Sequence, residues 1–313
     1  MKILLVTDGS PYSDTATAML DALCLSSGTG VTVMTVVPEH TFLGGITLGK
    51  LRGVRLDKDA QQQRALELLE ATVQKIGNAG LKVESLVRWG NPAEETLKLA
   101  KEEGMSLIVM GAKGLAESLA FRLGSVAQSV MKHARASVLL VRETTALTDR
   151  VQAAKKKASV NRVLLATDGS RYSDAVSQFL LDLPLPQQCE VIVMTALQSH
   201  LTAWMKTPTL DFQNNQELLV KLQAAEESKA RKITAKSEQQ LKEKGYKTAS
   251  VVLRGGAAES ILAAAKEYKP DIVALGSRGM SGIESFLLGS VAERVARYAD
   301  CSVLIGRHPG KMK

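Results

Sequence analysis

The chain has 313 residues, enough for about two domains of ordinary size. With 45% hydrophobic and 23% charged residues it has a globular composition, and no stretch approaches the ~18 consecutive apolar residues of a membrane span. The net charge of +8 comes mostly from basic residues interleaved with glutamate, and aromatic residues make up only 4%, which argues against a stacking platform for nucleic acid.

The location of the protein can be predicted from the start of the chain and from its cysteines. Residues 1–8 lack the long apolar run of a signal peptide. The three cysteines, Cys24, Cys189 and Cys301, lie far apart and form no CxxC pair, so we expect them to be buried small hydrophobic residues. Both observations favour a cytoplasmic protein in a reducing compartment.

The first half of the chain predicts strands and helices in strict alternation. In chain order these are a strand over Ile3–Thr7, a helix around Ala16–Leu25, a strand over Val31–Val37, a helix over residues 58–79, a strand over Leu81–Val87, a helix over Pro92–Glu103, a strand over Leu107–Met110, a helix over Ser125–His133 and a strand over Ser137–Val141. Such alternation indicates a parallel sheet with helices on both faces. Ligands of such sheets bind beyond the carboxyl ends of the strands.

The second half repeats the first. Residues 4–10 recur as 164–170, an offset of 160, whereas Gly124–Ala127 recurs as Gly289–Ala292, an offset of 165. The second copy therefore has five extra residues, all between 197 and 254, where we expect a tolerant loop and helix. We predict a first domain over 1–142, a linker over 143–159 and a second domain over 160–307. Each is expected to be Rossmann-like, with an open five-stranded parallel sheet.

The first loop whose side chains could bind a ligand follows the first strand of each copy, as Thr7-Asp8-Gly9-Ser10 and as residues 167–170. The carboxylate of Asp8 or Asp168 could accept from a base amine or a ribose hydroxyl, or bind a metal. The structural alternative is an Asx turn or a helix N-cap.

The second loop combines glycines with a helix start. Gly111-Ala112-Lys113-Gly114 is followed after nine residues by Gly124-Ser125, and the second copy has the same spacing from Gly276 to Ser290. Glycines let backbone N–H groups approach an anion, and the positive end of a helix dipole favours the same ligand. The alternative is that Ser125–Gln128 and Ser290–Glu293 are capping boxes. Because the pattern occurs twice, each time after a strand, we favour phosphate binding.

The G-x2-G-x9-G-S pattern in both copies resembles the ATP-binding branch of the universal stress protein family, in its tandem two-domain form. The resemblance implies that ATP, with magnesium, binds in each domain, with Asp8 and Asp168 near the adenosine and the metal. Val36 and Ala196 would present backbone to adenine, and Met110 and Leu275 would flank the base or ribose. The phosphates would contact Gly111, Gly114, Gly124, Ser125 and Val126 in the first domain, and Gly276, Gly279, Gly289, Ser290 and Val291 in the second.

The smaller aliphatic at Ala196 leaves the packing of adenine in the second domain less well defined than at Val36. One decoy is rejected. Residues 44–51 nearly match a P-loop, but Leu51 takes the place of the hydroxyl residue and no strand leads directly into the segment.

These observations predict an ATP-binding stress-response protein that acts as a nucleotide-dependent switch or sensor, with no catalytic residues and at most slow ATP hydrolysis. The alternatives are a dimerisation scaffold for a ligand other than ATP and a weak ATPase. The resemblance also implies antiparallel pairing of Ser137–Val141 with Ser302–Ile305, which makes an internal pseudo-dimer, and a homodimer is a further possibility. His40 and His200, at equivalent positions, are candidates for the border of the nucleotide sites; the alternative is a pair of exposed loop histidines matched by chance or shared descent.

Overall fold

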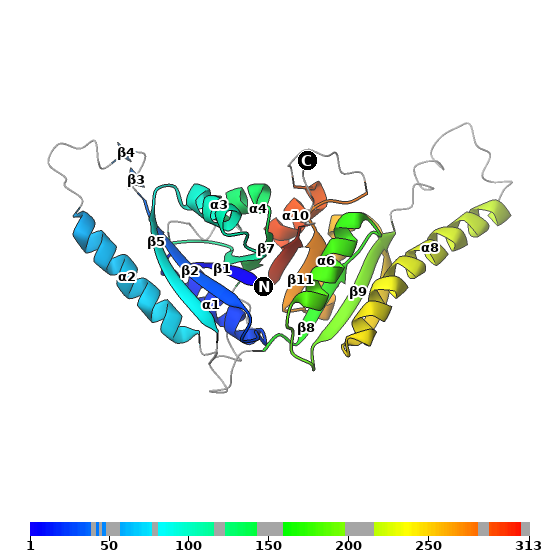
Figure 1. Cartoon of the computed structure of the whole chain (residues 1–313). Helices are drawn as coiled ribbons and strands as arrows, with labels where there is room; N and C mark the ends of the chain where they lie inside the picture. The colour runs from blue at the N-terminus through cyan, green and yellow to red at the C-terminus, as the bar shows by residue number, and fades with distance from the viewer. Residues whose placement is uncertain are drawn as a thin grey trace. The chain divides into compact units, whose positions relative to one another are not determined.

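The computed structural model of the chain describes residues 1–38, 42–43, 46–47, 57–76, 81–115, 123–142, 159–197, 216–280 and 288–307 (Figure 1). The chain forms two compact units that meet in the sequence between Ser159 and Val160. The predicted linker up to residue 158, and His40 and His200, lie outside the described residues.

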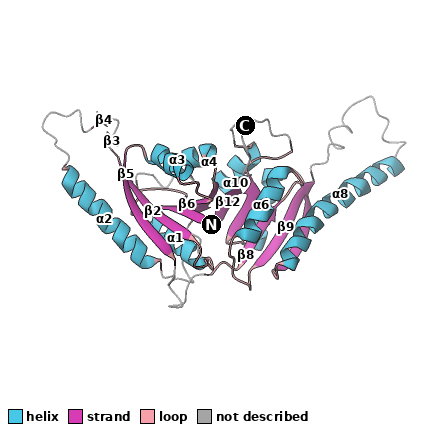
Figure 2. Ribbon diagram, in the orientation of Figure 1, coloured by secondary structure: helices cyan, strands magenta, loops and turns pink. Residues whose placement is uncertain are grey.

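The first unit has the predicted alternation of strands and helices (Figure 2). Its described helices are α1 (Pro11–Ala22), α2 (Lys58–Lys75), α3 (Pro92–Glu102) and α4 (Ser125–His133). Its parallel strands are β1 (Lys2–Val6), β2 (Gly30–Val37), β5 (Lys82–Trp89), β6 (Leu107–Gly111) and β7 (Ser137–Val141). A short antiparallel pair, β3 (Phe42–Leu43) and β4 (Ile46–Thr47), was not predicted.

The second unit repeats this order. Its described helices are α6 (Arg171–Asp182), α8 (Gln216–Glu243), α9 (Ala257–Tyr268) and α10 (Ser290–Tyr298). Its strands are β8 (Arg162–Ala166), β9 (Glu190–Leu197), β10 (Lys247–Arg254), β11 (Ile272–Gly276) and β12 (Ser302–Gly306).

The strand order within each sheet fixes the place of a ligand site. In the first unit the parallel order is β7-β6-β1-β2-β5, and in the second it is β12-β11-β8-β9-β10. In both, the first strand of the unit lies between the second and the fourth, so the order reverses beside it. The crevice beyond the carboxyl ends at such a switch point is where doubly wound sheets bind ligands.

Helices cover both faces of each sheet, as predicted. In the first unit α1 and α2 pack side by side on one face, and α3 and α4 on the other. In the second unit α6 and α8 share one face, and α9 and α10 the other. The central strands are buried throughout, as in Ile3–Leu5 and Leu107–Val109, which is why their sequences are continuous apolar runs rather than alternating ones.

Several predicted bounds shift for identifiable reasons. Helix α1 begins at Pro11 rather than near Ala16, because the Ser10 side chain caps it and proline suits the first turn. Helix α2 ends at Lys75 instead of residue 79, and residues 77–79 lie outside the described residues. The periodic apolar residues of this segment predict a buried face of Ala65, Leu68, Leu69, Thr72 and Ile76; all are buried except Leu68, which is half-buried.

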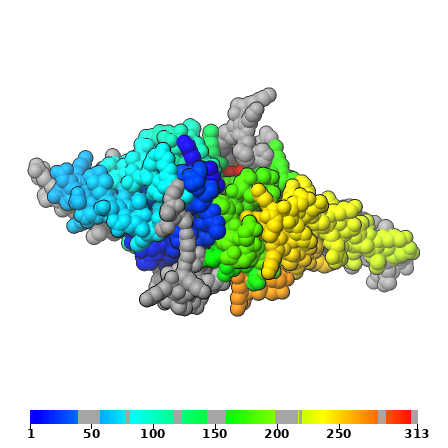
Figure 3. All heavy atoms as spheres, turned by 60° about the horizontal axis from the view of Figure 1, so that its bottom comes forward, coloured from blue at the N-terminus to red at the C-terminus, as the bar shows by residue number. Residues whose placement is uncertain are grey.

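The second unit differs from the first in its long helix. Helix α8 has 28 residues against 18 in α2, so the extra length of the second copy lies at least partly in helix. The first turns of α8, yellow-green in Figure 3, extend beyond the other described elements of this unit, and Val220 is 64% exposed.

The prediction for the cysteines was wrong at Cys24, which is exposed, whereas Cys189 and Cys301 are buried.

Candidate functional site

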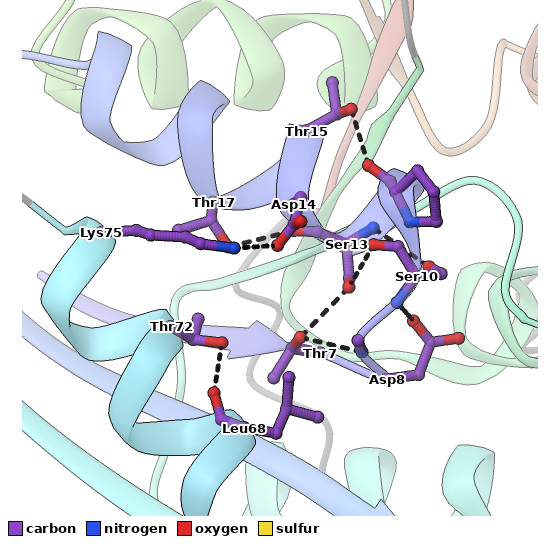
Figure 4. Close-up of polar contacts among 12 residues, drawn as sticks. Thr7, Asp8, Ser10, Ser13, Asp14, Thr15, Thr17, Leu68, Thr72 and Lys75 are labelled. Atoms are coloured by element: carbon purple, nitrogen blue, oxygen red, sulfur yellow. Dashed lines mark hydrogen bonds and ion pairs between the residues drawn. The ribbon is translucent and has the colours of Figure 1, made fainter.

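The loop after the first strand is built by a compact network of hydroxyl groups. The Ser10 hydroxyl accepts from the backbone N–H of Ser13 (3.2 Å), and the Ser13 hydroxyl donates to the Ser10 carbonyl (2.8 Å). The Thr7 hydroxyl donates to that of Ser13 (3.1 Å), which ties the strand end to the first turn of α1 (Figure 4). Gly9 adopts a φ of +76°, a conformation that L side chains rarely adopt. The second unit repeats each of these features.

The carboxylate of Asp8 joins this loop to the glycine loop. One oxygen accepts from the backbone N–H of Ser10 (3.0 Å) and the other from that of Leu115 (3.0 Å). Asp168 does the same with Ser170 (2.9 Å) and Met280 (3.1 Å). Of the two structural alternatives, the Asx turn is present and the N-cap is not, because Ser10 and Ser170 are the N-cap residues.

The first glycine of each loop is required by a close approach of backbone. A Cβ on Gly111 would lie 2.9 Å from Cβ of Tyr12, and one on Gly276 would lie 2.8 Å from the backbone carbonyl carbon of Tyr172. Both glycines end the fourth parallel strand of their unit, under the first turn of the helix that follows the aspartate loop. The two loops are therefore in direct contact at the switch point of each sheet.

The G-S end of the motif returns to the glycine loop. The backbone N–H of Gly124 donates to the carbonyl of Ala112 (2.8 Å), and that of Gly289 donates to the carbonyl of Ser277 (2.9 Å). The helices α4 and α10 begin at the next residue, so their N-termini point at the same loop. This closure brings the GxxG and GS parts of the pattern together in both units.

The capping-box alternative is wrong in both copies. The N-cap residues are Gly124 and Gly289 rather than the serines, and a glycine has no side chain with which to cap the helix. The serines occupy the first helical position. The N-cap side chain that usually accepts from the first-turn N–H groups is therefore missing from the N-cap position of both helices, and a helix N-terminus favours an anion.

A cavity in the second unit is lined by all the residues that the family pattern assigned to the nucleotide site of this domain. It has a volume of about 140 Å³. Its lining includes all eight predicted positions of this domain: Asp168, Ala196, Leu275, Gly276, Gly279, Gly289, Ser290 and Val291. In the first unit the matching residues occupy the equivalent strand ends and loops. Val36 lies near the end of β2, Met110 and Gly111 end β6, and Gly124 caps α4.

The cavity also contains residues that the sequence did not single out, among them Thr167, Ser173, Met194, Ile261 and Arg278. A signal for some of them was available, because Tyr12-Ser13-Asp14 recurs as Tyr172-Ser173-Asp174 and because both glycine loops have a basic residue before their second glycine.

Basic side chains surround the glycine loop of the second unit. The Arg278 guanidinium lies over the Tyr172 ring (5.6 Å to its centroid) and donates to its hydroxyl (3.3 Å). The Arg171 guanidinium does the same at 5.0 Å and 3.0 Å, and its hydrogen bond, more than that of Arg278, lowers the pKa of Tyr172. Burial lowers the pKa of Arg307 to about 10, and the charge of Arg278 contributes. In the first unit Lys113 lies 5.8 Å from the Tyr12 ring centroid.

A resident metal is not supported by the donor set. Each aspartate oxygen in the first loop already accepts from a backbone N–H, and within the described ranges no group of three or more histidine, cysteine, aspartate or glutamate side chains gathers. A magnesium ion that arrives with a nucleotide would take most of its ligands from phosphates and water.

In each unit an ion pair links the helix that follows the aspartate loop to the long helix beside it. Lys75 on α2 lies 2.7 Å from Asp14 on α1, and Lys236 on α8 lies 2.8 Å from Asp174 on α6. The two long helices can be compared through the residue that packs against the positive-φ glycine of the aspartate loop in each unit. A Cβ on Gly9 would lie 3.3 Å from Leu68, and one on Gly169 would lie 3.1 Å from Ile233.

Comparison with known proteins gives the same two-part division. The profile of the universal stress protein family matches residues 1–142 and again residues 159–307. A universal stress protein of Bacillus subtilis is 28% identical over 153 residues, which are 47% of this chain and 99% of that protein. One of Methanocaldococcus jannaschii is 29% identical over 150 residues, 48% of this chain and 84% of its own length.

A solved structure shares the fold over the whole length. The crystal structure of a universal stress protein from Archaeoglobus fulgidus aligns with a TM-score of 0.63 and 22% identity, and the alignment covers 99% of this chain and 98% of that one. Among the described residues, no helix is both long and apolar enough to cross a membrane.

Proposed function

This chain belongs to the universal stress protein family, and on that premise we propose that each of its two domains binds ATP and that the bound nucleotide switches the protein between states during a stress response. The observation that carries the proposal is the cavity of the second domain, where all eight residues predicted from the sequence line one space. These residues come from the ends of the neighbouring strands β8, β9 and β11 and from the start of α10.

The chemistry of the lining suits an adenosine. Met194, Ile261 and Leu275 supply apolar contact for a flat base, and Thr167 and Ser173 supply hydroxyl groups. Ligand pockets are typically apolar with a few placed polar groups. The volume of about 140 Å³ is below the roughly 300–1,000 Å³ of most such pockets. We therefore expect the base and sugar to occupy the cavity and the phosphates to lie across the glycine loop.

The phosphate end of the ligand is favoured by charge. Helix α10 begins after Gly289, which has no side chain to cap it, and Arg278 lies in the glycine loop. The charge of Arg278 contributes to the lowered pKa of Arg307. Guanidinium groups bind phosphate oxygens through paired N–H donors. In the first domain α4 likewise begins after a glycine, Gly124, and Lys113 is the basic residue of the glycine loop.

The proposed role is binding rather than turnover. The groups that face the ligand are backbone N–H donors, hydroxyls, a guanidinium and the Asp168 carboxylate, which is held by two backbone N–H groups. We propose that they bind the nucleotide rather than activate a nucleophile. Any hydrolysis is expected to be slow. The aspartates are not proposed as holders of a resident metal, and no step of the function depends on one.

Isothermal titration of the purified full chain with ATP tests the proposal. We expect two sites per chain and weaker binding of a nucleotide without the polyphosphate. Ala196→Trp fills the cavity of the second domain and should remove one site, whereas Ala196→Val introduces the residue of the first domain and should leave both. Binding that is unchanged by Ala196→Trp, or no binding by the native protein, refutes the proposal.

The alternatives have their own readouts. Release of phosphate at a rate above 1 s⁻¹, roughly the lower end of ordinary enzyme turnover, would make the chain an ATPase. A different small molecule that copurifies with the protein would favour the scaffold. The pairing of the last strands of the two domains, and any homodimer, stay predictions that chemical cross-linking and mass measurement in solution can test.

A further inference from the structure

The aspartate after the first strand has the same two hydrogen bonds in both domains. One oxygen binds an N–H of its own loop, and the other binds the N–H that follows the second glycine, 107 residues away for Asp8 and 112 for Asp168. We infer that Asp8 and Asp168 are positioning residues, whose carboxylates clamp the aspartate loop to the glycine loop and so set the shape of the phosphate cradle. This role rests on the proposed nucleotide binding, but the clamp itself does not.

The geometry of a carboxylate makes it an effective clamp. Its two oxygens are held at a fixed separation, and each accepts at 2.9–3.1 Å from a backbone donor. Hydrogen bonds to an ionised acceptor are about twice as strong as neutral ones. The aspartate therefore ties two loops that come from different strands, and neither loop can move without breaking a charge-assisted bond.

The second glycine of the loop supports the clamp independently. A Cβ on Gly114 would lie 2.7 Å from the Oδ2 atom of Asp8, and one on Gly279 would lie 2.8 Å from that of Asp168. Both are closer than real Cβ contacts come. A larger residue here would have to displace the carboxylate oxygen that accepts from the next N–H, so the motif position and the aspartate depend on each other.

The clamp also selects which backbone groups remain for a ligand. The N–H groups of Leu115 and Met280 are engaged by aspartate, while their side chains are 69% and 71% exposed. The phosphates are left with the N–H groups nearer the helix start. Each carboxylate oxygen accepts one N–H and keeps a second acceptor site, so the clamp is a role additional to the ligand or metal contact that the sequence suggested for Asp8 and Asp168.

The test is Asp8→Asn together with Asp168→Asn in the full chain. Asparagine keeps one oxygen for Ser10 or Ser170, but its NH2 group faces the other backbone N–H, so two donors meet. Amide hydrogen exchange of the nucleotide-free protein, followed by NMR, should be roughly tenfold faster or more at Leu115 and Met280, because a hydrogen bond to a charged group is lost. ATP affinity should fall by a similar factor whether magnesium or EDTA is present.

A matched control removes a neighbouring charge. Asp14→Asn with Asp174→Asn makes the same chemical change one turn into the next helix, where each aspartate forms only an exposed ion pair with a lysine. It should leave both amide exchange rates and ATP affinity unchanged. A further variant, Gly114→Ala in the Asp8→Asn background, should cost less affinity than Gly114→Ala alone, since residues in contact are not additive.

The outcomes separate the clamp from the proposed function. Unchanged exchange at Leu115 and Met280 overturns the clamp whatever the nucleotide does. Loss of affinity only in the presence of magnesium overturns the positioning role in favour of metal binding. Faster exchange in a protein whose native form binds no ATP supports the clamp and refutes nucleotide binding instead.

Discussion

Gly276→Ala tests why glycine ends the fourth strand of the second domain. The added Cβ would lie 2.8 Å from the Tyr172 carbonyl carbon, 2.9 Å from its oxygen and 3.1 Å from the Ser173 nitrogen. All three atoms are backbone, in the first turn of α6, so no side chain can rotate away. Either β11 or the start of α6 has to shift by several tenths of an ångström.

The expected cost follows from what such a shift disturbs. Overpacking a well-packed site costs roughly 1–3 kcal/mol. Here the displaced turn also holds the Ser173 hydroxyl, which donates to the Ser170 carbonyl at 2.9 Å and accepts from Thr167 at 3.1 Å. We therefore expect the upper part of that range. Because Ser173 lines the cavity, ATP affinity of the second domain should also fall.

Urea denaturation is the assay, with Gly30→Ala as the control. Nothing lies within 4 Å of a Cβ on Gly30, and its φ is ordinary, so alanine there should be neutral or stabilise by up to about 1 kcal/mol. Gly276→Ala should lower the midpoint of the second domain's transition without a change in m-value. If the two variants are equally stable, the close approach of α6 to β11 is not what requires glycine.

Three further predictions concern single side chains. Arg278→Lys should weaken ATP binding at the second site severalfold by titration calorimetry, because lysine loses the planar fork and the bond to the Tyr172 hydroxyl; equal affinity would contradict this. Arg171→Ala should raise the pKa of Tyr172, because the Arg171 hydrogen bond is the main cause that lowers it. An unchanged pKa in a titration followed by phenolate absorbance would refute that cause. Burial raises the pKa of Cys189 to about 12, so it stays protonated at pH 8 and iodoacetamide should label exposed Cys24 instead; mass-spectrometric detection of labelled Cys189 in the native protein would count against it.

The fold was predictable because the strands and helices leave strong periodic signals. Buried runs such as Leu107–Met110 predict parallel strands, and α4 and β7 fall at their predicted bounds. The first residue of α1 was harder to predict, because Ser10 and Pro11 determine it through capping and not through apolar periodicity. The pair β3–β4 has two residues in each strand, too few for an alternating pattern to show.

The sequence predicted which residues of the second domain lie together, but not the contacts that each of them makes. The spacing of the glycines identified the loops, and the cavity collects all the positions assigned to the second domain. The capping boxes failed by one position, since a serine after glycine can be either N-cap or first helical residue. The partner of Asp8 could not be inferred, because Leu115 contributes only its backbone N–H and any residue but proline would serve.

The ion pairs at the two long helices show that the repeat preserves a helix face rather than a residue position. Lys75 comes seven residues after Leu68, but Lys236 comes three after Ile233, although Leu68 and Ile233 occupy the same place beneath their glycines. Positions three and seven along a helix share one face, one turn apart. An alignment of the two domains that matches Leu68 with Ile233 would therefore not match Lys75 with Lys236. Chimeras of the two domains should exchange the whole long helix. Exchanging single residues according to that alignment would move each lysine away from the aspartate that it pairs with.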